Sequence, residues 1–509
     1  MVARIHTVAF QGIETLPVEV QVHIAPGIPA FTVVGLPDKA VAESRERVRA
    51  ALSSMGIQIP AKKILINLAP ADVQKEGSHF DVPIALGMLV ALGFLPGDAL
   101  EGYVALGELA LDGKLQPVAG VLPAALAASE QRKSIICPED NGAEAAFAGD
   151  IEVLAPGSLL ALVNHFKGMQ VLAAPEPSLA TTRKQVPDLA EVRGQAVAKR
   201  AIEIAAAGGH NLLMIGPPGS GKSMLAACLA GILPPMTPEE MLETNLIASV
   251  AGKLMKGGFS DTRPYRDPHH SSSMAAMVGG GRRAVPGEIS LAHHGILFLD
   301  ELPEFPRGVL ESLRQPLETG SISIARVEAH VTYPARFQLI AAMNPCRCGY
   351  LDDAGRACNK APRCGGDYQS RLSGPLLDRI DMHVDVPAVE TLSMLTPADA
   401  EPSATVAARV ARARAVQTQR FAAMEIPART NAEVSGDALQ AMVTLTPESR
   451  SLVEDATKRL GLSMRGLTRV MRIARTIADL AGAADVTRTH LAEALSYRQQ
   501  PQGRFLDAA

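Results

Sequence analysis

The sequence predicts an α/β protein built from roughly three domains. Its 509 residues exceed what one hydrophobic core usually holds, and 47% of them are hydrophobic, so each domain can bury a core of its own. Aromatic residues make up only 4%, and tryptophan is absent. This composition favours α/β layers packed by Ala, Leu and Val over an aromatic all-β sandwich.

Charge and hydropathy exclude several classes of protein. The formal net charge is −4, so any contact with nucleic acid must come from local basic patches. The N-terminal segment MVARIHTVAFQGIE lacks the apolar stretch and cleavage site of a secretory peptide. The longest apolar run, residues 82–95, is interrupted by Pro and Gly and falls short of the ~20 residues that a membrane span needs. We therefore expect a soluble, cytoplasmic protein with no membrane partner.

Residues 1–170 are predicted to form the first α/β domain, because strand and helix patterns alternate along them. Residues 18–22 alternate as a half-buried strand, and residues 40–55 carry apolar side chains at helical spacing. Residues 63–68 return to a strand pattern, and residues 83–95 have the composition of a buried helix.

A proline-rich linker, residues 171–188, is predicted to separate this domain from a second α/β domain. Residues 189–390 follow the pattern helix, strand, glycine loop, helix, which is typical of a nucleotide-binding domain. The chain then becomes rich in Ala and Arg, so residues 391–509 are predicted to form a helical domain with a frayed tail after residue 499.

A strand that leads into a glycine loop marks the predicted nucleotide site. Residues 211–215 are apolar, and the next eight residues, GPPGSGKS, fit the pattern GxxxxGK[ST] at the start of a helical run. Glycines let backbone N–H groups surround phosphates, Lys222 reaches the outer phosphates, and Ser223 ligates Mg²⁺. A glycine turn that matches by chance is disfavoured, because strand and helix flank the loop correctly. The predicted nucleotide-binding residues here are Gly216, Pro217, Pro218, Gly219, Ser220, Gly221, Lys222 and Ser223.

A second apolar strand, residues 296–299, leads into two acids. Asp300 is predicted to bind nucleotide by holding Mg²⁺ through water, and Glu301 to polarise the attacking water. An apolar run before Asp-Glu is common by itself. It gains weight here from the glycine loop upstream.

Four of the six cysteines lie close together in the sequence, with one, nine and five residues between successive members. Four soft ligands in one loop suit a closed tetrahedral zinc site in a reducing compartment, and free thiols are the alternative. Cys137 and Cys228 are predicted to be buried apolar residues. The candidate zinc ligands are Cys346, Cys348, Cys358 and Cys364.

Longer motifs indicate a specific family. They are GLPDKAVAESRERVRAAL, INLAPADVQKEGSHFDVPIALG, GPPGSGKSMLA, RPYRDPHHSSS, GEISLAHHGILFLDELPEF, AAMNPCRCG, RLSGPLLDRID and RVMRIARTIADL. Over nearly its whole length the chain resembles the ComM/YifB group of magnesium-chelatase-like AAA+ ATPases. The resemblance implies a P-loop AAA+ core, a helical lid and a homo-hexameric ring. For ComM proteins it also implies a DNA motor that drives branch migration while transforming DNA is integrated.

The resemblance also assigns roles to further residues. Asn344, after a third apolar strand, would sense the γ-phosphate and help position water, with a simple turn residue as the alternative. Arg379 stands where the finger of a neighbouring subunit is expected, and Arg371 is its competitor. Arg465 opens a lid helix and fits a second sensor, with Arg469 as its competitor.

Two insertions resemble pore-lining elements of helicase-like AAA+ proteins. Lys222 and Asp300 are 78 positions apart, which leaves room for an inserted basic element, and residues 320–332 alternate like a β-hairpin. Basic side chains on such loops can bind DNA phosphates regardless of sequence, whereas ordinary charged surface loops are the alternative. The adjacent histidines are expected to pack in a loop or face DNA and not to bind metal. The basic residues and histidines of the inserted element are Arg263, Arg266, His269, His270, Arg282 and Arg283.

The first domain resembles the Lon-protease fold without its catalytic pair. In the matching segments, residues 75–81 and 117–123, His79 stands in place of the nucleophilic Ser and Leu122 in place of the Lys base. A Ser–Lys dyad needs both partners within hydrogen-bond reach, so we do not expect proteolysis. The domain is expected to build a second tier of the ring or to contact DNA.

The function predicted from these observations is that of an ATP-dependent hexameric DNA motor. It would promote branch migration and integration of DNA during recombination or natural transformation, on single-stranded or branched DNA and with recombination proteins as partners. The predicted cofactors are ATP, Mg²⁺ and a structural Zn²⁺. A magnesium-chelatase-like motor subunit, a protein-remodelling AAA+ ATPase and an ATP-dependent protease are the alternatives.

Overall fold

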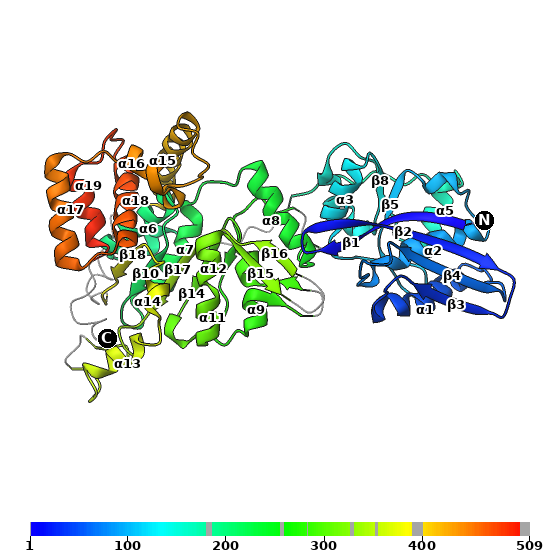
Figure 1. Cartoon of the computed structure of the whole chain (residues 1–509), viewed down its shortest axis with the longest axis horizontal. Coiled ribbons are helices and arrows are strands. Elements are labelled where there is room, and N and C mark those ends of the chain that lie inside the picture. The colour runs from blue at the N-terminus through cyan, green and yellow to red at the C-terminus, as the bar shows by residue number, and fades with distance from the viewer. Residues whose placement is uncertain are drawn as a thin grey trace.

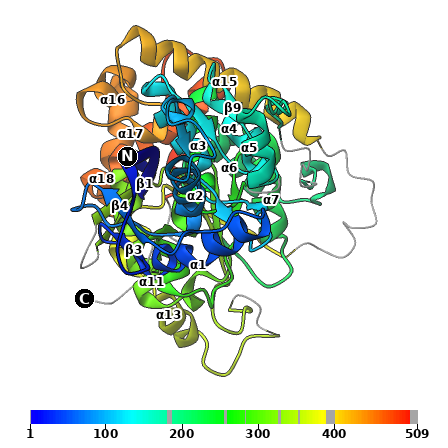
Figure 2. The same cartoon turned by 90° about the vertical axis from the view of Figure 1, so that its right-hand side faces the viewer.

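The computed structural model shows an elongated molecule with an α/β domain at one end and the C-terminal helices at the other (Figure 1). Seen along the long axis, the N-terminal domain lies in front of the rest of the chain (Figure 2). The predicted mixed α/β fold class is confirmed, whereas the likeness of the first domain to Lon protease stays a prediction. No described helix is both long and apolar enough to cross a membrane. The structure describes residues 2–179, 186–254, 259–281, 284–325, 330–351, 355–388 and 401–498.

Within the described residues, a seven-stranded sheet in the order β3-β4-β2-β1-β5-β8-β9 forms the centre of the N-terminal domain. Alternate side chains of β2 (Val18, Val20, Val22) are buried, as a half-buried strand requires. Helix α2 is buried on almost all sides because it packs against β1, β2 and α1. It ends at Ala91, short of the predicted residue 95, and Gly93 just beyond has a φ of 78°. The strands are β1 (Val2–Gln11), β2 (Glu14–Ala25), β3 (Ala30–Val34), β4 (Lys63–Ala69), β5 (Tyr103–Ala105), β6 (Glu108–Leu109), β7 (Leu115–Gln116), β8 (Ser134–Ile136) and β9 (Val153–Leu154). The helices are α1 (Lys39–Ser54), α2 (Asp81–Ala91), α3 (Val121–Glu130), α4 (Gly142–Ala145) and α5 (Leu159–Phe166).

A parallel sheet in the order β11-β14-β17-β10-β18 forms the centre of the second domain. Its inner strands are continuous apolar runs because helices cover both faces. The carboxyl ends of parallel strands lie at one edge of the sheet and the amino ends at the other. This separation decides where each candidate site residue lies. The strands are β10 (Leu212–Ile215), β11 (Tyr265–Arg266), β14 (Ile296–Leu299), β17 (Gln338–Met343) and β18 (Met382–Asp385).

The predicted hairpin is present as the antiparallel pair β15 (Ser321–Ala325) and β16 (His330–Pro334). The other insertion contains α8, which a Thr237–Glu240 capping box begins, and several short elements. Arg282 and Arg283 lie outside the described residues. The helices of this domain are α6 (Ala196–Gly208), α7 (Lys222–Ile232), α8 (Pro238–Val250), α9 (Met274–Val278), α10 (Glu288–Leu291), α11 (Arg307–Ser312), α12 (Arg314–Thr319), α13 (Arg363–Gln369) and α14 (Gly374–Leu377). Its remaining strands are β12 (Gly279–Gly280) and β13 (Val285–Pro286).

The C-terminal helices share a hydrophobic core with the second domain. Helix α15 packs against α6 and α7, and α18 packs against α6, α15 and α19. One buried cluster contains residues of both parts, from Leu189 of the second domain to Tyr497 after α19. The C-terminal helices are therefore packed, through α6 and α7, on one face of the parallel sheet. The helices of the lid are α15 (Ser403–Ala423), α16 (Gly436–Met442), α17 (Pro447–Leu460), α18 (Met464–Leu480) and α19 (Arg488–Ser496).

The N-terminal domain contacts both insertions. At the end of α8, the backbone carbonyl of Ser249 accepts from the N–H of Gly120 (3.1 Å), and its hydroxyl donates to buried Glu144 (2.5 Å). The Phe147 ring stacks on Phe259, with 4.0 Å between centroids. The β1–β2 turn packs Ile13 against the core that contains the β15–β16 hairpin. Figure 1 shows this junction between the blue and green parts of the chain.

Candidate functional site

The glycine loop at the end of β10 has a backbone that only glycine readily adopts. Gly219 and Gly221 have φ angles of 76° and 89°. A Cβ atom on Gly216 would lie 2.0 Å from the carbonyl oxygen of Val386, so a larger residue would clash. The loop enters α7 at Lys222, and this arrangement points the first N–H groups of the helix toward the loop.

Lys222 is buried inside this loop. Its Nζ donates to the carbonyl oxygens of Gly216 (2.8 Å) and Pro217 (2.9 Å) and to Oδ1 of Asn344 (3.3 Å). Burial lowers the pKa of Lys222, and the carboxylates of Asp300 and Glu301 partly oppose that effect. Asn344 follows β17, the neighbour of β10, so the two predicted phosphate-facing side chains meet at the carboxyl edge of the sheet.

Ser223 and Asp300 also meet at this edge. The Ser223 hydroxyl donates to Oδ2 of Asp300 (2.7 Å), and the Glu301 N–H donates to Oδ1 (2.8 Å). A hydroxyl and a carboxylate in contact, beside a phosphate-binding loop, are the donor set on which Mg²⁺–ATP is usually held. The residues present fit ATP and Mg²⁺: the loop and Lys222 would hold the phosphates, and Ser223 and Asp300 the ion. When bound, Mg²⁺ neutralises charge on the phosphate oxygens.

Glu301 is half exposed and has a φ of 52°, which is uncommon for a residue other than glycine. Its Oε2 lies 3.1 Å from Nδ1 of His270, whose ring contacts those of His269 and Phe305. Sequence reasoning gave His270 a packing or DNA-facing role and missed this contact. The sequence holds no signal for this contact, because it arises only from the pairing of β11, which His270 follows, with β14 in the sheet.

The predicted finger and second sensor lie at the opposite edge of the sheet. A cavity of about 670 Å³ is lined by Asn211, Gln338 and Asp381, at the amino ends of β10, β17 and β18. The four residues of β10 separate Asn211 from Gly216 by roughly 15 Å. Arg379 and Arg465 line this cavity and so do not lie beside Lys222 of their own chain. Among the described residues its arginines are Arg263, Arg336, Arg379, Arg414, Arg429, Arg465, Arg469 and Arg472.

The competitors of these two arginines are placed differently. Arg371 lies at the carboxyl edge, where its Nη1 contacts Oε2 of Glu304 (2.9 Å). Arg469 shares the amino-edge cavity with Arg465, and its Nε lies 2.9 Å from Oδ1 of Asp381. Arg379 is buried and forms an ion pair with Glu318.

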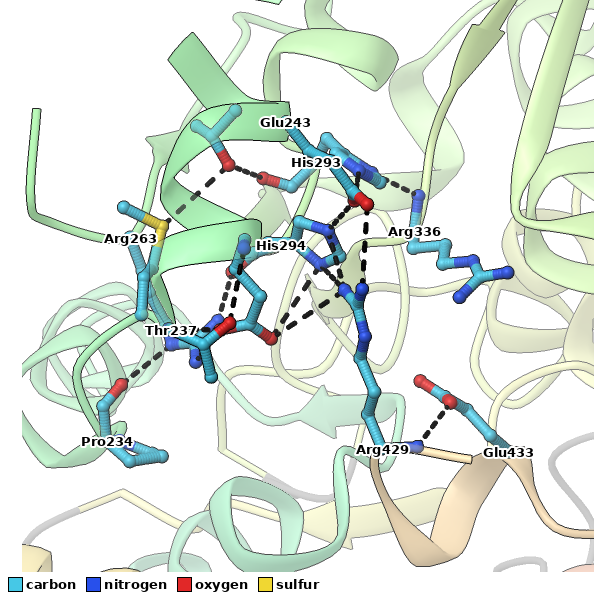
Figure 3. A network of polar contacts seen from close by, with 12 residues as sticks. Pro234, Thr237, Glu243, Arg263, His293, His294, Arg336, Arg429 and Glu433 are labelled. Carbon is cyan, nitrogen blue, oxygen red and sulfur yellow. Dashed lines mark hydrogen bonds and ion pairs between the residues drawn. The ribbon is translucent and has the colours of Figure 1, made fainter. Parts of the chain in front are cut away.

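A polar network joins α8 to the lid beside this cavity (Figure 3). Glu243 contacts Nε2 of His293 (3.1 Å) and of His294 (2.5 Å), and Arg429 of the lid contacts His294 and Glu243. Burial opposes ionisation of Glu243, but the hydrogen bonds from the two histidines prevail and lower its pKa to about 2. Glu243, His293 and His294 could be mistaken for a metal site. However, the N–H of Arg336 donates to Nδ1 of His293 (3.0 Å), so Nε2 carries the proton and has no lone pair for a metal.

Two arginines of the insertion are engaged within the chain. Arg266 forms a bidentate ion pair with Glu288, at 2.5 and 2.6 Å. Arg263 pairs with Glu240 (2.7 Å) and donates to three backbone carbonyls. Both cations hold the fold around β11 together, so the sequence-based interpretation of Arg266 as a free phosphate contact does not fit the structure.

The two residues predicted to stand in place of the lost Lon dyad, His79 and Leu122, make contacts inside the fold. His79 is buried, with Nε2 2.9 Å from the carbonyl oxygen of Val8 and its ring against Phe10 and Phe80. The N–H of Leu122 donates to Glu144 (3.1 Å), inside the junction with α8. Cys137 and Cys228 are buried, as predicted.

The fold and this site define a P-loop ATPase of the AAA+ type related to magnesium chelatase. The profile described as "Magnesium chelatase, subunit ChlI" matches residues 188–394, "Subunit ChlI of Mg-chelatase" matches residues 20–141, and "Magnesium chelatase, subunit ChlI C-terminal" matches residues 400–498. The chain belongs to the ComM/YifB family of magnesium-chelatase-like AAA+ ATPases.

Relatives support this assignment along almost the whole chain. The chain is 44% identical to the uncharacterized protein YifB of Escherichia coli, over 97% of this chain and 96% of that protein. It is 43% identical to the competence protein ComM of Haemophilus influenzae, over 97% of each. The magnesium-chelatase 67 kDa subunit of Chlorobaculum parvum is 29% identical over 30% of this chain and 22% of that protein.

Proposed function

We propose that this protein is an ATP-driven homo-hexameric DNA motor that promotes branch migration during recombination or natural transformation. The ring is supported by the distribution of candidate residues over two edges of one sheet. Lys222 and Glu301 lie at the carboxyl edge, and Arg379 and Arg465 line a cavity at the amino edge. A head-to-tail arrangement brings the amino edge of one subunit to the carboxyl edge of the next, and such an arrangement forms a ring when the rotation between subunits closes.

In this proposal each part of the site has one task. Backbone N–H groups of the glycine loop and Lys222 bind phosphate oxygens, and Ser223 and Asp300 hold the ion. Glu301 orients the attacking water and accepts its proton. Asn344 orients Lys222, whose Nζ lies 3.3 Å from its Oδ1, and helps to position the water. The neighbour's Arg379, followed by its Arg465, would stabilise charge that develops on the leaving phosphates.

The DNA part rests on the relation to a competence protein over the full chain length. It is consistent with the two insertions, α8 to β13 and the β15–β16 hairpin, which lie beside each other and meet the N-terminal domain. Arg266 is paired with Glu288, so the proposed phosphate-binding residue becomes Arg282, in the same insertion. A magnesium-chelatase-like motor subunit is the alternative, because three ChlI profiles match this chain, although the 67 kDa chelatase subunit aligns with less than a third of it.

Measurement of ATP hydrolysis with and without single-stranded DNA tests the proposal directly. We expect stimulation by DNA of any sequence, affinity that falls as salt rises, and ATP-dependent movement of a branched junction. Arg282→Ala should weaken DNA binding equally on all sequences and reduce the salt slope by about 1, with basal ATPase activity retained. Lys39→Ala, which removes an exposed cation on α1, is the matched control.

The alternatives predict other outcomes. An active hexamer that neither binds DNA nor responds to it would contradict the DNA part and favour a protein-remodelling ATPase. Rescue of metal insertion into a porphyrin by partner subunits would favour the chelatase alternative. A hexamer without ATP hydrolysis would contradict the whole proposal.

A further inference from the structure

The cysteine-rich loop directly continues β17 and lies on the nucleotide loop. β17 ends at Met343, Asn344 contacts Lys222, and only Pro345 separates Asn344 from the first thiol, Cys346. A few residues on, Gly349 has a φ of 85°, and a Cβ there would lie 2.5 Å from Cδ of Pro218. The backbone of the cysteine loop is thus in direct contact with the glycine loop that holds the phosphates.

The same loop brings its thiols together. The sulfur atoms of Cys346, Cys348 and Cys364 all lie within 4.8 Å of one another. The distance between the sulfur atoms of Cys346 and Cys348 is 3.0 Å. The thiol of Cys358 interacts with those of Cys348 and Cys364. All four are free thiols, from two segments of the loop and from α13. Cys346 is buried, and the other three are partly exposed.

A hydrogen bond ties α13 to the first residues of the cysteine loop, next to the nucleotide site. Nε2 of Gln369, at the end of α13, donates to the carbonyl oxygen of Pro345 (3.0 Å), next to Asn344. Around the thiols, Leu351 packs against Gly365, Arg356 lies over the Tyr350 ring, and Tyr368 of α13 is buried. Burial of so few apolar groups does not compensate the conformational entropy lost when such a loop is ordered. Another interaction must hold it, and a metal ion bound by four thiolates is a known way to fold a short loop.

We propose that Cys346, Cys348, Cys358 and Cys364 bind one Zn²⁺ ion, and that this ion holds Asn344 and the nucleotide loop in place. Each thiol loses its proton when it binds the ion, so four thiolates surround Zn²⁺ in a closed tetrahedral site with no open position. The ion is then structural and takes no part in hydrolysis. Its removal loosens the loop on which Pro218 rests and the turn that carries Asn344. Nucleotide affinity therefore depends on zinc occupancy.

Metal analysis of the wild-type protein, purified without chelator, is the first test. We expect about one zinc per chain, released by a thiol-modifying mercurial with four equivalents of reagent. Cys364→Ser and Cys358→Ser should each lower zinc content, whereas Cys137→Ala, which removes a buried thiol of the N-terminal domain, should leave it unchanged. Absence of zinc, with four freely reactive thiols or with a Cys346–Cys348 disulfide, would overturn the site.

Binding of a fluorescent ATP analogue tests the coupling, which rests on the nucleotide site of the proposed function. Chelation of zinc from the wild-type protein should weaken binding about tenfold and speed amide exchange in residues 216–221, and added zinc should reverse both effects. Unchanged affinity and exchange after complete zinc removal would contradict the coupling. The two hypotheses fail separately: a zinc-loaded protein that binds no nucleotide contradicts the ATPase, and a zinc-free protein that hydrolyses ATP contradicts only the metal site.

Discussion

The two edges of the ATPase sheet differ in how their charges are satisfied. At the carboxyl edge, the Glu301 side chain is 50% exposed, and the hydrogen-bond partners of Lys222 among the described residues are carbonyl, amide and hydroxyl oxygens, none of them charged. At the amino edge, Arg379 and Arg469 already have carboxylate partners, and Glu243 has two histidines. At the carboxyl edge no carboxylate in the described part of the chain lies within ion-pair distance of Lys222, whereas at the amino edge Arg379 and Arg469 are held by carboxylates of their own chain.

This difference suits the proposed site, whose two halves would come from two neighbouring subunits because they do not meet within one chain. Parallel strands send every loop that follows them to one edge, which collects Lys222, Asp300 and Asn344. Elements that precede the strands collect at the other edge together with the lid. Variants at the two edges should therefore behave differently, and the following predictions are ordered from the largest expected effect to the smallest.

Glu301→Gln should abolish turnover but not nucleotide binding. The carboxylate orients water and takes its proton, a contribution of about 10²- to 10⁴-fold in rate, and it is not needed to hold phosphate. Lys222→Ala should instead weaken binding of the nucleotide itself. Phosphate release and equilibrium binding of a fluorescent ATP analogue separate the two effects, with Glu239→Gln on the exposed start of α8 as control. A Glu301→Gln protein that turns over at the parental rate would show that the water is oriented by another group.

Arg379→Ala should abolish ATP hydrolysis, and mixing these subunits with Lys222→Ala subunits should restore part of it. In a one-to-one mixture of exchanging Arg379→Ala and Lys222→Ala subunits, about a quarter of the head-to-tail interfaces carry both intact edges. Neither variant should hydrolyse ATP alone, and light scattering should show intact rings. Because Arg379 is buried, Arg379→Lys should be measured in parallel, since it keeps a cation in place.

Arg371 provides the matched control for this experiment. It lies at the carboxyl edge beside Glu304, so a mixture of Arg371→Ala and Lys222→Ala subunits places both defects on the same edge. No rescue is expected there. Rescue by Arg371→Ala subunits, and none by Arg379→Ala subunits, would exchange the roles assigned to the two arginines.

His270→Ala should lower kcat about tenfold and leave KM for ATP nearly unchanged, because a hydrogen bond to the carboxylate of Glu301 is lost. His270→Asn keeps a donor and should restore part of the rate. His269→Ala is the control, since its Nδ1 contacts only Ser271 (2.8 Å) among the hydrogen bonds of its ring. A change in KM alone would indicate that His270 acts on the loop and not on Glu301.

Acid should destabilise the amino edge first. Burial lowers the pKa of His210 to about 4 and that of His293 to about 3, below the value of about 6.5 in an unfolded chain. Between the folded and the unfolded pKa of each histidine, the unfolded chain binds a proton that the folded chain does not. The free energy of unfolding is therefore highest above about pH 6.5 and falls as the pH drops below it. The expected slope is about 1.4 kcal/mol per pH unit for each histidine.

Urea unfolding between pH 7.5 and 5 measures this slope. His293→Gln should reduce it by the contribution of one histidine, about 1.4 kcal/mol per pH unit. Glu243 adds nothing in this range, because its folded pKa of about 2 and its unfolded value both lie below pH 5. A slope that His293→Gln leaves unchanged would show that this histidine is not the group that titrates.

The strands and the nucleotide loop could be predicted from sequence because their signals are local. Apolar runs of strand length precede Gly216, Asp300 and Asn344, and each of these residues lies at the carboxyl edge of the sheet. The β15–β16 hairpin could be predicted for the same reason, since its alternation has a period of two.

Contacts that depend on sheet order could not be predicted. Arg266 lies on β11, the outermost strand of the sheet, and Glu288 lies on α10, which precedes the neighbouring strand β14. The two residues meet because these strands are neighbours. The pairing of β11 with β14 also places His270 beside Glu301. Arg379 lies at the amino edge of the sheet. A single sequence contains the strands but not their order, so the partner of each charged residue remains open until the sheet is known.

The junction at Ser249 means that residues 1–179 cannot be treated as a removable module. Buried Glu144 accepts a hydrogen bond from Ser249 of α8 as well as from Leu122 and Asn141 of its own domain, and burial raises the pKa of its carboxyl group. A chain cut before the ATPase domain would expose the Phe259 ring, and the excised domain would uncover Glu144. Any tilt of α8 would therefore move the N-terminal domain with it, because the hydrogen bond to Glu144 and the stacking of Phe147 on Phe259 connect the two.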